Sequence, residues 1–522
     1  MSDDRRARAQ ALFDYHQRVK HRPEAYAAGP ETLDWDAQPD PFRTFVGAPR
    51  ENLPLAPQGL ATTFAEAQGV ARTQPLTRAN IGALLHLAFG LSAWKEFGPD
   101  RWALRCPPSS GNLHPTEAYL LAQGVENLPD GLYHYAVREH ALEHRFKPEA
   151  AAAGAPALWV GLSSIHWREA WKYGERAFRY CQLDMGHALA ALRIAAGVLG
   201  WRAQIVRGLE PPRLAGLLGL DRPEDFVGAE AEEAEILVAL TAQQAPPDFA
   251  AGAWTGQANL LDRRKFYHWP VIEEAAQASQ GAAEGNAEPR LKREPPPNAR
   301  RADEIILQRR SAQRFDAKYR MDAATFYALL ASALPGAAPF DLWSYASRLD
   351  LLLFVHRVEG LAPGLYALPR CADANDLRGA LAETFLWRPV EGAPADLPLF
   401  LLHEGDCRAL ARKLFCHQAI AADGCFAICM LADFEAPVME NPWRYRQLHW
   451  EAGMIGHALY LEAETQNLRG TGIGCFLDDS LHGLLGLRDG RRQSLYQFTI
   501  GRPLVDERLQ SLPAYPGKDR PG

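Results

Sequence analysis

"LAGLLGL" at residues 214–220 returns almost unchanged as "LHGLLGL" at residues 481–487, with one differing position. Two shorter segments also recur, and all three keep the same order along the chain. The recurring segments are "GLY" (131–133 and 364–366), "GHAL" (186–189 and 456–459) and the heptapeptide. The two "GHAL" segments and the two heptapeptides lie nearly the same distance apart along the chain, while "GLY" requires a longer insertion in the second copy. Ordered self-similarity of this kind predicts two copies of one structural unit.

Each copy combines a long apolar helix with strand-like runs. In the first copy, apolar residues at helical spacing run from Met185 to Leu199 before Gly200, and "EAGMIGHALYLEAETQNLRG" (451–470) ends in the same way. The copies close on "AEILVAL" (234–240) and "SLYQFTIG" (494–501), which have strand composition. Each copy is therefore expected to contain a long buried helix and a closing strand.

The chain's bulk properties limit the classes of function. Its 522 residues exceed one core at roughly 150 residues per domain, and its net charge of −7 argues against a nucleic-acid partner. No apolar run reaches the roughly 18 residues of a membrane helix, and the N-terminus has no apolar signal region. The eight cysteines form no CxxC pair, which favours reduced thiols and a cytoplasmic protein.

Composition also suggests where the domains begin and end. The stretch 273–301 is rich in Ala, Gly, Pro and charge, which is typical of a linker that buries no core. The first 60 residues are Pro-rich and lack a clear period, so we expect an irregular arm wrapped on the first domain. The expected divisions are an arm (1–60), domain 1 (61–245), a linker (246–300), domain 2 (301–510) and a tail (511–522).

Four segments carry residues suited to ligand binding. "RCPPSSGNLHPTEAYLL" (105–121) feeds a turn-rich serine loop into a strand. In "IILQRRSAQRFD" (305–316), three arginines surround Ser311, and they suit either an anion or a solvated basic helix face. "NLRGTGIGCFLDD" (467–479) is either a loop that lets backbone N–H groups approach a flat ligand or a helix stop. Its Cys475 is either reactive or a packed thiol, and "TIGRP" (499–503) ends a strand on an arginine.

Together these segments resemble the nitroreductase-like flavoprotein superfamily, and specifically its SagB/ThcOx-type dehydrogenases with two fused nitroreductase domains. The resemblance covers nearly the whole chain, from "YHQRVKH" (15–21) to "GRP". It implies an α+β fold with two tandem domains. Each would be a mainly antiparallel sheet flanked by helices, and the two would form an intrachain pseudo-dimer with FMN at their interface. The cofactor-binding residues it implies are Ser109, Ser110 and Asn112 from copy one, and Arg309, Arg310, Ser311, Arg314, Gly472, Ile473, Gly474 and Arg502 from copy two.

The two copies differ in which of these ligands they keep. Copy one has the serine loop but no arginine cluster around "PLTRANIGALL" (75–85), and it closes on "LVALTAQQ" without Gly-Arg-Pro. Copy two has the arginines, the glycine loop and Gly-Arg-Pro, but reads "FDLWSYASRLDLLLFV" (340–355) in place of the serine loop. Because the losses are complementary, we expect one composite FMN site in a single chain, with the second site decayed. A monomer or a larger assembly stays open.

The resemblance also implies the catalytic residues. Azoline-oxidising members use a Lys-Tyr pair in the region where this chain has Lys172 and Tyr173, and copy two lacks such a pair. The predicted activity is FMN-dependent dehydrogenation of a thiazoline, an oxazoline or a related C–N bond in a small molecule or peptide. Two alternatives remain: an NAD(P)H-dependent nitro or quinone reductase, and a flavin-binding scaffold of a peptide-modifying complex. No metal site is predicted.

Overall fold

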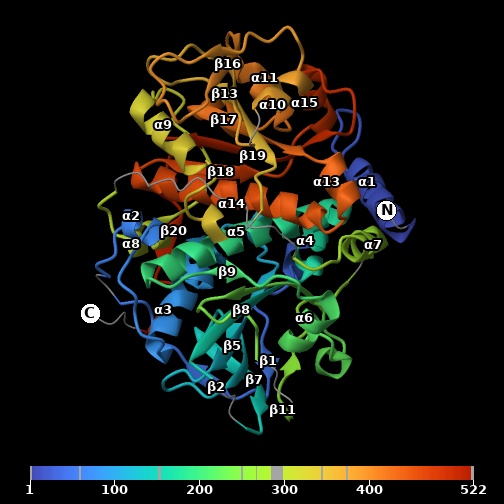
Figure 1. Cartoon of the computed structure of the whole chain (residues 1–522), viewed down its shortest axis with the longest axis vertical. Helices are drawn as coiled ribbons and strands as arrows, with labels where there is room; N and C mark the ends of the chain where they lie inside the picture. The colour runs from blue at the N-terminus through green and yellow to red at the C-terminus, as the bar shows by residue number, and fades with distance from the viewer. Residues whose placement is uncertain are drawn as a thin grey trace.

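Two antiparallel sheets lie at opposite ends of the molecule, with long helices between them (Figure 1). The computed structural model describes residues 3–57, 60–150, 154–247, 251–265, 267–283, 298–342, 345–371 and 374–518. The first sheet runs in the order β11 (Gly252–Trp254), β7 (Ala141–Pro148), β6 (Gly131–Ala136), β5 (Thr116–Gln123), β8 (Ala157–Ser164), β10 (Glu233–Ala239), β9 (Gln204–Ile205), with β2 (Arg50–Asn52) also paired to β7. The second runs β15 (Arg388–Pro389), β16 (Phe400–Glu404), β14 (Gly364–Leu368), β13 (Leu349–Val355), β17 (Phe426–Asp433), β19 (Arg492–Gly501), β18 (Arg469–Ile473).

The two sheets have equivalent topology. The path β7-β6-β5-β8-β10-β9 in the first unit matches β16-β14-β13-β17-β19-β18 in the second, and every one of these pairings is antiparallel. The "GLY" segments open β6 and β14, which occupy the same place in each order. This confirms the predicted α+β fold with two tandem units of mainly antiparallel sheet flanked by helices.

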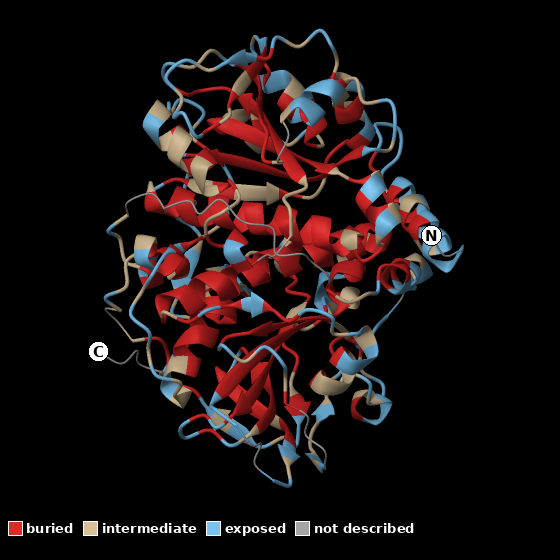
Figure 2. Ribbon diagram, viewed as in Figure 1, coloured by how far each residue is buried: buried red, intermediate tan, exposed pale blue. Residues whose placement is uncertain are grey.

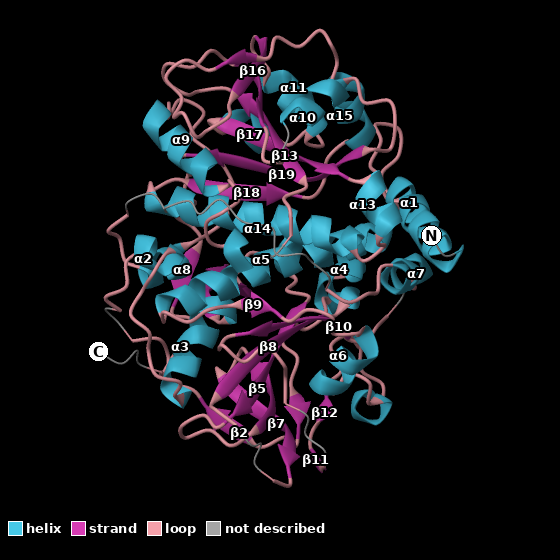
Figure 3. Cartoon of the chain, in the orientation of Figure 1, coloured by secondary structure: helices cyan, strands magenta, loops and turns pink. Residues whose placement is uncertain are grey.

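The long helices α5 (Ala177–Val198) and α14 (Arg444–Thr465) pack on each other between the sheets (Figures 1 and 3). Aligning their first residues also aligns the heptapeptides of α6 (Pro211–Leu218) and α15 (Asp478–Leu485), and it pairs Gly186 with Gly453. These two glycines mark the closest approach, since an added β-carbon would lie 2.2 Å from the Trp450 carbonyl oxygen or 2.1 Å from that of Leu183. The "GHAL" match instead pairs Gly186 with Gly456, so it is out of structural register by almost one helical turn.

The expected irregular arm begins with a helix instead, α1 (Asp3–Arg18). It packs on α7 (Pro270–Ala278) and on α13 (Glu435–Glu440), so it contacts both units and not only the first. The sequence favours this helix because Ala, Leu, Arg and Gln are good helix formers and two aspartates occupy its first turn. Its buried residues, Ala9, Leu12, Tyr15 and His16, recur at helical spacing.

The segments expected to be a linker and a tail also join the folded body. Strand β11 pairs with β7, and β12 (Gln257–Ala258) pairs with β1 (Phe45–Val46). Helix α7, inside the expected linker, buries Ile272, Ala275, Ala276 and Ala278. Near the C-terminus, β20 (Gln510–Leu512) pairs with β3 (Leu91–Phe97) of the first unit. Residues 284–297 of the expected linker lie outside the described residues, and the domain boundaries stay a prediction.

The main hydrophobic core runs through both units, and smaller clusters cover the outer face of each sheet (Figure 2). Every residue of α5 is buried, including charged and polar ones such as Asp184 and His187. A buried polar group requires a hydrogen-bond partner, so Asp184 and His187 indicate that polar groups lie beside the helix. Within the described ranges, no helix is long and apolar enough to cross a membrane.

Candidate functional site

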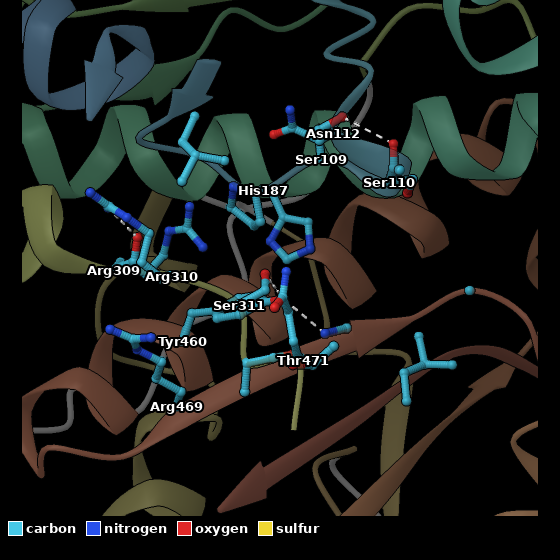
Figure 4. Close-up of a pocket in the computed structure, with 18 of the residues that line it drawn as sticks. Ser109, Ser110, Asn112, His187, Arg309, Arg310, Ser311, Tyr460, Arg469 and Thr471 are labelled. Carbon is cyan, nitrogen blue, oxygen red and sulfur yellow. Dashed lines mark hydrogen bonds between the residues drawn. The ribbon is translucent and has the colours of Figure 1, made fainter. Parts of the chain in front are cut away.

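A cavity of about 440 Å³ lies where the two units meet, beside α5 and α14 (Figure 4). Its wall combines the serine loop and α5 of the first unit with the segment after α8 (Ala302–Gln308) and the end of β18 from the second. Ten of the predicted site residues line it together: Ser109, Ser110, Asn112, Tyr173, Arg309, Arg310, Ser311, Gly472, Ile473 and Gly474. Residues from distant parts of both copies thus meet at one site.

Arg309 provides a buried cation at the cavity wall. Its Nε donates to the Cys106 carbonyl oxygen at 2.9 Å and its Nη2 to that of Arg105 at 3.2 Å. These bonds tie the second unit to the first unit just before the serine loop. Its Nη1 is buried and has no hydrogen-bond partner among the described residues. A buried N–H of a cation without an acceptor is costly, so an anionic oxygen from a ligand would satisfy it.

Arg310 extends the same positive region. Its Nη1 donates to Ser92 Oγ at 3.1 Å and to the Leu307 carbonyl oxygen at 2.9 Å. Burial, followed by the charge of Arg309, lowers its pKa to about 10. Lys95 and Arg469 also line the cavity, and burial, followed by the charge of Arg310, lowers the pKa of Lys95. The protein therefore holds like charges together at this end of the cavity, an arrangement that an anionic ligand would stabilise.

The glycine loop forms another part of the cavity wall, and aromatic rings press against it. A β-carbon on Gly472 would lie 1.7 Å from Tyr496 Oη, and one on Gly474 would lie 1.9 Å from Tyr180 Cε1. The Gly472 N–H donates to Tyr460 Oη at 2.8 Å, and that hydroxyl also bonds with Ser311 Oγ at 2.9 Å. These glycines are needed for the close approach of side chains, and the Gly472 N–H has a protein partner.

The serine loop is fixed by its own hydrogen bonds. Ser110 donates through its backbone N–H and its Oγ to Asp184 Oδ1, both at 3.1 Å. Asn112 Nδ2 donates to the Ala103 carbonyl oxygen at 2.9 Å, and Asn112 Oδ1 pairs with His114 Nε2 at 3.0 Å. Gly111, Asn112 and His114 all have positive φ, which makes the turn tight. Burial raises the pKa of Asp184 to about 7 against the opposing hydrogen bonds.

The Lys172–Tyr173 pair ends α4 (His166–Tyr173), next to the serine loop. A β-carbon built on Gly111 would lie 2.7 Å from Tyr173 Oη and 3.2 Å from Lys172 Nζ. Tyr173 lines the cavity, whereas Lys172 is half-buried just behind Gly111 and does not line it. Burial lowers the pKa of Lys172, and the carboxylate of buried Glu169 opposes this shift. Lys172 thus lies close to the cavity, and its burial makes the ammonium group easier to deprotonate than that of an exposed lysine.

Two predicted arginines point elsewhere. Arg314 is exposed, and its carbonyl oxygen accepts from the Leu504 N–H at 2.9 Å. Arg502 is exposed too, and its guanidinium lies 4.0 Å from the centre of the Tyr319 ring. Neither is among the described residues that line the cavity. After β19 ends, Pro503 and Leu504 line the cavity, whereas the side chain of Arg502 does not.

Several lining residues were not anticipated from the sequence. Asp184 sits in an apolar helix, which is a signal that sequence reasoning could have used. The aromatic residues gave no comparable signal of a site, because aromatic side chains in long helices and strands normally pack in the hydrophobic core. The additional lining residues include Tyr180, Asp184, His187, Tyr460, Arg469 and Tyr496.

The pseudo-symmetric counterpart of the cavity is occupied by side chains. When α5 is aligned with α14 from their first residues, Asp184 corresponds to Glu451 and Tyr460 to Arg193. Glu451 accepts from Ser347 Oγ and from Arg370 Nη1, the latter at 2.8 Å. Arg193 pairs with Asp341 at 2.6 Å. These interactions hold Glu451 and Arg193 at the positions that correspond to Asp184 and Tyr460 beside the open cavity.

Comparison with known proteins agrees with this architecture. A model of the nitroreductase family matches residues 71–231. This match lies within the first unit. A predicted nitroreductase of Methanocaldococcus jannaschii is 25% identical over 139 residues, 24% of this chain and 67% of that protein. The crystal structure of a predicted nitroreductase from Anabaena variabilis superposes with a TM-score of 0.69 at 21% identity, covering 95% of this chain and 99% of that one. The chain therefore shares the fold of that structure along nearly its whole length.

Proposed function

We propose that the chain is an FMN-dependent oxidoreductase whose single cofactor site is the cavity between its two units. The observation that carries the proposal is the cluster of Arg309, Arg310, Arg469 and Lys95 at one end of the cavity. Burial, followed by the charge of a neighbouring arginine, lowers the pKa of Arg310 and of Lys95. The carboxylate of Glu464 accepts from the Arg310 backbone N–H at 3.0 Å and pairs with Arg469 at 3.5 Å, so the four cations outnumber the acidic group beside them. The match of residues 71–231 to the nitroreductase family supports a flavin oxidoreductase.

The residues present fit FMN in three respects. The unpartnered Arg309 Nη1 and the cation cluster suit the phosphate. The glycine loop, with Tyr180, Tyr460 and Tyr496 packed on it, gives a flat wall for an aromatic ring system. The volume of about 440 Å³ is within the usual range of small-molecule sites, about 300–1,000 Å³. We also propose that the chain arose by tandem duplication and that the counterpart site, now filled by Arg193 and Glu451, was lost.

When bound, FMN supplies hydride transfer, and the chain supplies binding, orientation and proton transfer. Arg309 and Arg310 would hold the phosphate end, and the glycine loop would provide the wall beside the ring. The serine loop, braced by Asp184, closes the other side. We assign Lys172 Nζ as the base that takes a proton from one substrate carbon while the adjacent atom of the same bond loses a hydride, because burial lowers the pKa of this amine. Tyr173, at the cavity wall, would position the substrate.

The substrate class that fits this assignment is an azoline or a related C–N compound, in a small molecule or a peptide. A thiazoline or oxazoline becomes aromatic when it loses one proton and one hydride, so it needs both a base and a hydride acceptor. The Lys172–Tyr173 pair beside Gly111 supports this reading.

A second candidate is an NAD(P)H-dependent nitro or quinone reductase. It is favoured by the position of Lys172, which does not line the cavity directly. Hydride passing between two rings needs no side-chain base, so this activity makes no use of the Lys-Tyr pair. The two candidates therefore differ in their dependence on Lys172.

One set of measurements tests these assignments. The purified chain should be yellow and release one FMN per polypeptide, and two per polypeptide would contradict the single-site proposal. Flavin reduction is then followed anaerobically by stopped-flow absorbance with an azoline peptide and with NADPH. Bleaching by the peptide supports the dehydrogenase and bleaching only by NADPH supports the reductase. Tightly bound FMN with neither reaction would leave a flavin-binding scaffold.

A further inference from the structure

Two cysteines meet at the edge of the cavity. The Leu477 N–H donates to the Leu414 carbonyl oxygen at 2.8 Å, and Gln418 Nε2 donates to the Cys475 carbonyl oxygen at 3.4 Å. The two segments therefore run side by side in opposite directions, which places Cys416 opposite Cys475. The two thiols are within hydrogen-bonding reach, and both side chains are partly exposed. Cys475 lines the cavity itself.

A histidine from the N-terminal segment completes this cluster. His21 Nδ1 accepts from the Ala27 N–H at 3.0 Å, which leaves the proton of the neutral ring on Nε2. The His21 backbone N–H donates to Asp478 Oδ2 at 3.2 Å, and His21 forms a β-bridge with Leu477. These contacts fix the ring, whose remaining partner is the thiol of Cys475. The ring thus provides a positioned donor to a thiolate at Cys475.

The surrounding charges favour ionisation of one thiol of the pair. The hydrogen bond from Cys416, followed by that from His21, lowers the pKa of Cys475 against the effect of burial. Arg176 adds a positive charge, with its Nη2 donating to the Gly474 carbonyl oxygen at 3.0 Å. The same pairing raises the pKa of Cys416. The titratable and charged groups that face the pair are His21, Tyr26, Tyr173, Arg176, Tyr180 and Asp478.

We propose that Cys475 and Cys416 form a thiol–disulfide exchange site on the cavity wall that reacts with small disulfides. A thiolate beside a cation and a second thiol is the arrangement of an attacking and a resolving cysteine. The proposal does not depend on FMN, because it rests on residues of the protein alone.

The reaction balances without another reductant or oxidant. The Cys475 thiolate attacks one sulfur of a disulfide R–S–S–R, forming a mixed disulfide and releasing one thiolate, which takes up a proton. Cys416 gives up its proton and attacks Cys475 Sγ, which forms the protein disulfide and releases the second thiol. Overall, two protein thiols and one small disulfide become one protein disulfide and two small thiols.

The test uses the full-length chain in oxidised and reduced glutathione. After acid quenching and alkylation with iodoacetamide, peptide mass spectrometry should find a disulfide joining Cys416 and Cys475. C416S should instead retain glutathione on Cys475, and C475S should give neither product. C371S is the matched control, since Cys371 is also partly exposed and is expected to leave the bond unchanged. Absence of the 416–475 bond in the wild-type protein would overturn the proposal.

A rate measurement on the folded wild-type protein gives an independent result. Cys475 should be alkylated faster than Cys371 at pH 6, because burial and nearby Asp350 raise the pKa of Cys371. H21Q should slow alkylation of Cys475 by about twofold at this pH, because loss of the hydrogen bond from His21 raises the pKa of Cys475 from about 5 toward 6 and the thiolate fraction falls. Equal rates for Cys475 and Cys371 in the wild-type protein would contradict the proposed reactive thiolate.

Discussion

Replacing Arg310 with alanine should weaken binding of FMN and leave binding of riboflavin, the same ring system without the phosphate, nearly unchanged. Arg310 lies in the cation cluster with Arg309 and Arg469. Its side chain reaches the first unit through Ser92, so it also helps to close the cavity at that end. A phosphate placed here would gain from its charge, whereas the ring system contacts the glycine loop.

The structure limits the size of the effect. Both terminal nitrogens of Arg310 already have protein acceptors, so we count one charge-assisted bond to the phosphate. Such a bond contributes about 1.5–3 kcal/mol. At about 1.4 kcal/mol per tenfold, the Kd for FMN should rise about 10- to 150-fold. The variant also relieves repulsion with Arg309, so the cofactor-free protein should not melt at a lower temperature.

The assay is titration of cofactor-free protein with FMN and with riboflavin, followed by quenching of flavin fluorescence. Arg314→Ala is the matched control, because Arg314 belongs to the same segment but is exposed and outside the described cavity wall. Its Kd for FMN should stay within about twofold of the wild-type value, since an exposed charge at a distance is screened by solvent. Equal weakening of FMN and riboflavin by Arg310→Ala would refute the phosphate assignment and indicate a general disturbance of the cavity.

Three further changes test the other parts of the site. Lys172→Ala should leave FMN bound and lower the rate of dehydrogenation by about 10²–10⁴, the usual contribution of a positioned base. The rate of flavin reduction by NADPH in the same stopped-flow assay should not change. An equal loss of both rates would show that the role of Lys172 is structural. Gly474→Ala should destabilise the protein by about 1–3 kcal/mol in urea unfolding, because the new methyl group would displace Tyr180, and an unchanged midpoint would contradict this contact. Asp184 has a pKa raised to about 7 in the folded protein, so its contribution to stability is fully present below its unfolded pKa and is lost as pH rises through about 7. Asp184→Asn should therefore lose less stability than the wild type between pH 5 and pH 8, and parallel profiles from urea unfolding would show that Asp184 does not titrate there.

The α+β architecture with two equivalent units, and most of the segments that line the cavity, could be predicted from the sequence alone. The heptapeptides of α6 and α15 keep the same register as α5 and α14 because each occupies the same helix in equivalent units. The serine loop and Arg309–Ser311 were recognisable because runs of turn formers and of arginines are local features. The helix of residues 3–18 was missed, although its helix formers and apolar spacing were present, because the proline-rich stretch after it outweighed them.

Which of those residues share a site, and what surrounds them, depends on tertiary packing. Arg314 and Arg502 belong to motifs of the right kind, yet the chain turns them toward solvent and onto Tyr319. Asp184 and Tyr180 reach the cavity because α5 crosses α14 at Gly186 and Gly453, a contact between equivalent positions of the two units. The pairing of Cys416 with Cys475 depends likewise on a single hydrogen-bonded crossing of two distant segments. Local sequence sets helices, turns and charges, but the direction in which a side chain points depends on packing between segments that the sequence keeps far apart.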